Sequence, residues 1–190
     1  MGGSGFAIAS APFVSSAASS VLLAWVYVIS ACFFTSAAFL QVVGSPWLTV
    51  AWWAAAIQQV GTIFFNVNTI RGLGEAQGRV QDVLLVWRPE AFGSICFLVS
   101  SVLAFAALDD SGRRVWTLQR SDVDLRATWW NMAGSVLFGI SAVTGYVTPG
   151  TDVPLNAAWM NATTMLGALC FVRAAWIVLP SSEADPCSNP

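Results

Sequence analysis

Five long apolar runs constrain this chain more than any other feature of its sequence. They cover residues 17–43, 47–70, 89–108, 128–147 and 155–179. A helix needs about 20 apolar residues to cross a bilayer. Each run is apolar on both faces, without the alternation typical of a barrel strand, and in lipid every backbone amide must form its hydrogen bond within the protein. The runs therefore predict an all-α integral membrane protein, a bundle of five transmembrane helices.

Composition supports the membrane assignment. Of 190 residues, 56 % are hydrophobic and 9 % are charged, whereas charged residues make up about 25 % of an ordinary soluble domain. The mean hydropathy is +0.68. The expected partner is therefore the lipid bilayer, and a net charge of −2 gives no reason to expect nucleic acid.

The segments outside the runs are polar or small. Residues 1–16 are rich in glycine, serine and alanine, and we expect a flexible leader. They lack the positive region that begins a signal peptide, so an uncleaved first span is favoured over cleavage near Ala37. Residues 17–180 form the predicted membrane domain, and the acidic tail 181–190 is expected to be disordered.

A short sequence motif recurs inside four of the runs: glycine, a small residue, an aliphatic residue, any apolar residue and phenylalanine. Its glycines and phenylalanines are Gly61 with Phe65, Gly93 with Phe97, Gly134 with Phe138, and Gly167 with Phe171. Residues four apart share one face of a helix. Since glycine lets a neighbouring backbone come close, the motif predicts helices that pack through the glycines, with phenylalanine filling the space beside them.

A polar residue extends each of these stripes by one turn. Three positions before the glycines stand Gln58, Glu90, Asn131 and Thr164. Such groups can form hydrogen bonds between helices, or the stripes can line a path or pocket. The first run fits the same frame with Ile29 at the glycine position and Phe33 at the phenylalanine position.

Part of the chain resembles a known family. The stretch 129–141 (WWNMAGSVLFGIS), Asn161 and the stretch 166–171 (LGALCF) are similar to the YrhK-like two-helix membrane domain of bacterial, especially actinobacterial, proteins. Residues 52–108 resemble a second, looser copy, so the resemblance implies two tandem copies after an extra N-terminal helix. It implies a bacterial inner-membrane protein and brings no catalytic residues. Arg173 stands where the family pattern leads us to expect an apolar residue.

Polar side chains at membrane depth are the candidate functional residues, because they are costly there. The candidate polar pocket consists of Gln58, Asn66, Asn68, Glu90, Asn131 and Asn161. The simpler interpretation is that the asparagines join helices, that Glu90 opens a helix after Pro89, and that Arg173 reaches toward the interface or pairs with Asp109 or Asp110.

No motif predicts an enzyme. Histidine is absent, and the sequence has neither a phosphate-binding loop nor a nucleophile elbow with partners. The four cysteines, Cys32, Cys96, Cys170 and Cys187, lack paired spacing, so neither a metal site nor a disulfide framework is indicated. We expect no cofactor.

Two functions remain open at this point. One is a structural or accessory role through association with other membrane proteins or with further copies of the chain. The alternative is a small transporter or channel for an ion or small solute that uses the polar face. The distribution of arginine favours an orientation with the N-terminus outside and the C-terminus in the cytoplasm.

Overall fold

The protein is helical, as predicted. The computed structural model describes residues 1–79, 83–110, 123–148 and 153–179. Their helices are α1 (Gly2–Ser10), α2 (Pro12–Ala17), α3 (Ser20–Gly44), α4 (Val50–Ala76), α5 (Val83–Asp110), α6 (Val123–Thr144) and α7 (Ala157–Val178). The five long helices overlap the five predicted runs, and their ends differ from the predicted ones by up to six residues. The predicted tail 181–190 lies outside the described residues.

Three helical segments of the described chain are long and apolar enough to cross a membrane: Ser20–Gly44, Trp87–Leu108 and Ala157–Val178. They belong to α3, α5 and α7. Large apolar side chains also cover the outward faces of α4 and α6, for example Ile63 and Val136. The bundle interior is different, since it holds phenylalanine, alanine and hydroxyl side chains.

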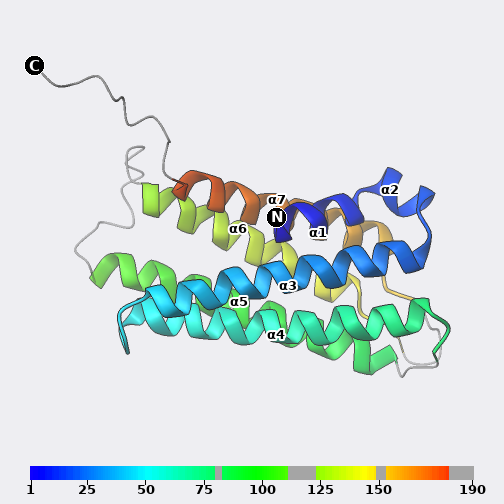
Figure 1. Ribbon diagram of the computed structural model, residues 1–190, viewed down its shortest axis with the longest axis horizontal. Coiled ribbons are helices and arrows are strands. Elements are labelled where there is room, and N and C mark those ends of the chain that lie inside the picture. Colours follow the sequence, from blue (N-terminus) through cyan, green and yellow to red (C-terminus); the bar gives the residue numbers. More distant parts are fainter. Residues whose placement is uncertain (80–82, 111–122, 149–152, 180–190) are drawn as a thin grey trace, which may run out of the picture.

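The expected flexible leader is instead two short helices. α1 lies between α3 and α7 (Figure 1) and buries Phe6, Ala7 and Ala9 among its neighbours. Its glycines explain the difference, because they allow very close packing. A Cβ atom on Gly2 would lie 2.8 Å from the carbonyl oxygen of Ser30, and one on Gly3 would lie 3.2 Å from that of Ala168. Burial therefore accounts for the low polarity of α1, whereas α2 has no buried residue.

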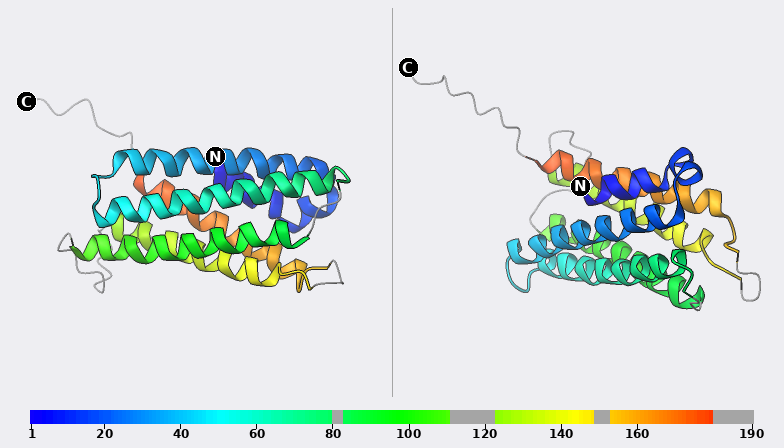
Figure 2. Two further views of the ribbon diagram at one scale, coloured as in Figure 1. Left: turned by 90° about the horizontal axis from the view of Figure 1, so that it is seen from below. Right: turned by 45° about the vertical axis from the view of Figure 1, so that its right-hand side comes forward.

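The helices form a ring. α4 packs most extensively on α5, and α6 on α7, while α3 contacts α4 and α5 contacts α6. α1 contacts both α3 and α7 and completes the ring along part of its length (Figure 2). Around the ring, consecutive helices run in opposite directions. This alternation determines which side chains meet inside the bundle.

α5 begins earlier than predicted. Pro89 lies inside the helix rather than at its start, because α5 begins at Val83. Proline has no amide hydrogen to donate to the carbonyl four residues earlier. Glu90 is therefore two turns into the helix, and its position is not explained by the dipole of the helix N-terminus.

Candidate functional site

The repeated glycines face neighbouring helices. Between α4 and α5, a Cβ atom on Gly61 would lie 2.9 Å from the ring of Phe97, and one on Gly93 would lie 2.5 Å from the ring of Phe65. The same exchange occurs between α6 and α7. There, a Cβ atom on Gly134 would lie 2.9 Å from the ring of Phe171, and one on Gly167 would lie 2.8 Å from the ring of Phe138. Each phenylalanine thus fills the space left by the glycine of the partner helix.

A third close antiparallel pair lies beside these two, and the sequence analysis missed it. α1 and α3 also run antiparallel and in close contact, with Gly2 and Phe6 on α1 and Ser30 and Phe34 on α3. The frame predicted for the first run was wrong by one residue, because Ile29 is 53 % exposed and Phe33 is 50 % exposed. The signal was present in the leader, since Gly2 and Phe6 have the same four-residue spacing as the other copies.

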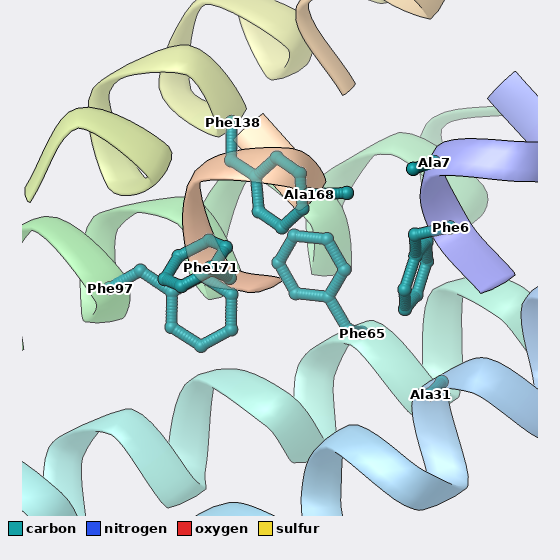
Figure 3. Close-up of a cluster of buried hydrophobic side chains, with 8 residues drawn as sticks. All are labelled: Phe6, Ala7, Ala31, Phe65, Phe97, Phe138, Ala168 and Phe171. Carbon is teal, nitrogen blue, oxygen red and sulfur yellow. The ribbon is translucent and has the colours of Figure 1, made fainter. Parts of the chain in front are cut away.

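Six phenylalanine rings meet at the centre of the bundle in two layers. Phe6, Phe65 and Phe138 form the first layer, with ring centroids 5.4–6.4 Å apart. Phe34, Phe97 and Phe171 form the second layer, with centroids 5.3–5.8 Å apart. Each antiparallel pair contributes one ring to each layer. We call the six rings the phenylalanine plug, and Figure 3 shows five of them.

A cavity of about 550 Å³ lies on one side of the plug. All three rings of the first layer line it, and it extends to the ends of the helices at Ser20 and Ala76. The polar side chains that line it are Ser20, Tyr27, Asn68, Thr69, Glu75, Glu90, Ser141, Asn161 and Thr164. We call this cavity the Glu90 pocket. Three of the six candidate residues, Asn68, Glu90 and Asn161, meet here.

Hydroxyl groups satisfy one another around the Glu90 pocket. Ser10 Oγ and Tyr27 Oη are 2.9 Å apart, and Ser141 Oγ and Thr164 Oγ1 are 2.6 Å apart. Ser141 also donates a long hydrogen bond of 3.5 Å to Glu90 Oε1. A carboxylate can accept about four hydrogen bonds. This single long bond from Ser141 therefore uses only a small part of the acceptor capacity of Glu90.

A second cavity of about 550 Å³ lies on the other side of the plug. Two rings of the second layer, Phe34 and Phe171, line it. Its other polar lining side chains are Gln41, Ser45, Gln58, Ser100, Thr128 and Asn131. Ser100 donates to Gln58 Oε1 at 3.3 Å. We call this cavity the Asn131 pocket.

The plug divides the predicted polar face into two. The polar residue three positions before each glycine points toward the helix start. Since neighbouring helices run in opposite directions, this position falls on one side of the plug for α5 and α7 and on the other side for α4 and α6. Glu90 and Thr164 therefore line one pocket, whereas Gln58 and Asn131 line the other. The single pocket expected from the sequence does not form.

Asn66 belongs to neither pocket. It lies five residues after Gly61, roughly 140° around the helix from the glycine face. Its side-chain amide donates to Thr35 Oγ1 on α3 and, at 2.9 Å, to the carbonyl oxygen of Thr62. The thiol of Cys32 lies 3.7 Å from its Oδ1 atom. Asn66 joins α3 to α4, which is the simpler of its two interpretations.

Replacing Asn66 by alanine should lower the free energy of unfolding by about 0.6–1.7 kcal/mol, the range for hydrogen bonds between membrane helices. Reversible unfolding in mixed micelles, combined with Thr35→Val in a double-mutant cycle, measures the coupling. A coupling of zero between the two positions would contradict this assignment.

Arg173 and the described cysteines line neither pocket. Arg173 is exposed on α7, and its suggested partners Asp109 and Asp110 have side chains outside the described residues. Cys32, Cys96 and Cys170 are free thiols. Within the described part of the chain, no group of three or more histidine, cysteine or acidic residues could hold a metal ion.

Comparisons with known proteins leave the family open. No protein-family model, no curated protein and no solved structure matches the chain. The resemblance to the YrhK-like domain therefore stays a prediction. What identifies the site is its own geometry: two cavities, each lined by apolar and polar side chains, on either side of six phenylalanine rings.

Proposed function

We propose that this chain is a multi-pass protein of the bacterial inner membrane that binds a small polar solute or ion in the Glu90 pocket and passes it across the bilayer. In this proposal α3 to α7 all cross the membrane, and α1 enters it only part of the way. The observation that carries the proposal is the pair of cavities, which extend from opposite ends of the bundle to the same plug. Ligand sites typically have volumes of about 300–1,000 Å³.

The plug explains how such a protein would stay closed. The side chain of Phe97 is only 1 % exposed and contacts rings of both layers. A polar solute cannot cross a layer of packed rings without losing its hydration. Passage therefore requires the rings to separate, so the described conformation is a closed one.

The accessory role is the second candidate. It is favoured by the absence of a polar route through the plug in the described bundle. It is weakened by the glycines, because Gly61, Gly93, Gly134 and Gly167 are all buried by contacts within the chain. Association with other proteins or with further copies would have to use other surfaces.

Cysteine labelling from the two sides of the membrane tests the proposed function. In a chain whose native cysteines are replaced by alanine or serine, Asn161→Cys places a thiol in the Glu90 pocket and Asn131→Cys places one in the Asn131 pocket. A charged, membrane-impermeant thiol reagent needs water and a thiolate. We expect Asn161→Cys to react only from outside and Asn131→Cys only from the cytoplasm.

Leu166→Cys is the control, because Leu166 lies on α7 and faces outward. A thiol there should react from neither side. Labelling of both pocket positions from the same side, or of neither, would contradict two separate aqueous pockets. If Asn161→Cys reacted only from the cytoplasm and Asn131→Cys only from outside, the two separate pockets would be supported and the proposed orientation would be reversed.

A further inference from the structure

Resting on the proposed solute site, we infer that the Glu90 pocket binds a small organic ammonium ion. The positive charge would lie against the carboxylate of Glu90, and the apolar substituents would lie against the first phenylalanine layer. The inference specifies the chemical class of the ligand, which the proposed function leaves open.

The charge of the pocket favours a cation. Two carboxyl side chains, Glu75 and Glu90, are among its described lining residues, and no arginine is. Arg71 and Arg88 lie on the same two helices but do not line the cavity. An anion would meet like charge at Glu75 and Glu90, and juxtaposed like charges oppose binding.

The floor of the pocket favours an organic cation over a metal ion. Phe6, Phe65 and Phe138 form a continuous aromatic surface, and Tyr27 lies beside it, with its ring centroid 5.6 Å from that of Phe6. Aromatic rings attract ammonium groups and accept their apolar substituents. A hard metal ion would instead need six or more oxygen ligands.

The remaining polar groups suit a ligand with one short polar arm. The hydroxyl groups of Tyr27, Ser141 and Thr164 already bond to protein groups. The side-chain amides of Asn68 and Asn161 line the cavity and make no hydrogen bond to another described residue. These two amides are available to a hydroxyl or carbonyl group of the ligand. The cavity volume of about 550 Å³ leaves room for several substituents.

Choline and its uncharged isostere 3,3-dimethylbutan-1-ol provide the test, because they share shape and hydroxyl group and differ in charge. Binding of each to the purified full-length chain in detergent would be measured by isothermal titration calorimetry. We expect choline to bind at least about tenfold more tightly than the isostere, since a charge-assisted contact in a partly buried site contributes on this scale.

Matched variants locate the preference. Glu90→Gln should remove it by weakening choline binding about tenfold, and Glu90→Asp should retain part of it. Asp124→Asn is the control, because Asp124 is exposed at the start of α6 and lines neither pocket, and it should change choline binding less than about threefold, as expected for an exposed charge. Thermal unfolding would establish that each variant is folded.

Equal affinity for the two compounds, or a preference for choline that survives in Glu90→Gln, would overturn the inference. Absence of binding by both compounds would overturn it as well. None of these results bears on the proposal of two aqueous pockets, which the cysteine labelling tests independently. The ligand class and the proposed site can therefore fail separately.

Discussion

Replacing Gly134 by alanine is expected to lower the free energy of unfolding by about 1–3 kcal/mol, the usual cost of overpacking. The new methyl group would lie 2.9 Å from the ring of Phe171 and 3.0 Å from the carbonyl oxygen of Gly167. The ring cannot move aside easily, because it packs against Phe34, Phe97 and Phe138. The carbonyl oxygen belongs to the backbone of α7, so relief requires the two helices to separate.

Gly139 provides the matched control within the same helix. A Cβ atom there would meet only a side-chain carbon of Leu98 at 3.5 Å, an ordinary contact. Gly139→Ala should therefore be neutral or stabilising, by up to about 1 kcal/mol, because alanine favours the helix. Unfolding in mixed micelles, followed by tryptophan fluorescence, would measure both variants. Equal stabilities for the two variants would show that Gly134 is not a close-packed contact.

The second large effect is expected at Phe97. Phe97→Ala should lower the free energy of unfolding by about 3–5 kcal/mol, the range for removing a buried aromatic side chain. Phe97 touches Phe65 in the first layer and Phe34 and Phe171 in the second, so its loss opens the plug. We therefore expect proteoliposomes that contain the variant to take up glycerol faster than wild-type proteoliposomes in a light-scattering assay.

Two further variants serve as controls for Phe97→Ala. Phe97→Leu preserves most of the volume and should keep the membrane sealed, even if its stability falls slightly. Phe92→Ala removes a ring from the same helix, but Phe92 is 54 % exposed and lies outside the plug, so it should cost less and cause no leak. If Phe97→Ala were folded and no leakier than Phe92→Ala, the plug would not separate the two pockets.

Much of the fold could be predicted because it depends on local sequence. A continuous apolar run of about 20 residues without alternation favours a helix, since a helix satisfies its backbone groups within one segment. The spacing of Gly134 and Phe138 places both residues on one helix face, whatever that helix contacts. The division of the polar residues was also implicit in the alternating helix directions, although we expected a single face.

The remaining features depend on contacts between distant segments. Nothing within residues 1–16 requires them to enter a bundle, and α1 is buried there because Gly2 and Gly3 fit closely against α3 and α7. The register of α3 was misjudged for the same reason, since the partner of Ser30 and Phe34 is α1, which was expected to be flexible.

The sequence by itself determined which segments are helical, which residues share a face and which polar groups lie among apolar ones, because these properties follow from helix periodicity and from the cost of unpaired backbone groups. Only the tertiary structure decided that three antiparallel pairs close into a ring and that six rings separate two cavities. It also decided that Asn68, Glu90 and Asn161 share one of these cavities while Asn66 joins two helices. Such convergence depends on which helices become neighbours, and that choice depends on packing between residues far apart in the chain.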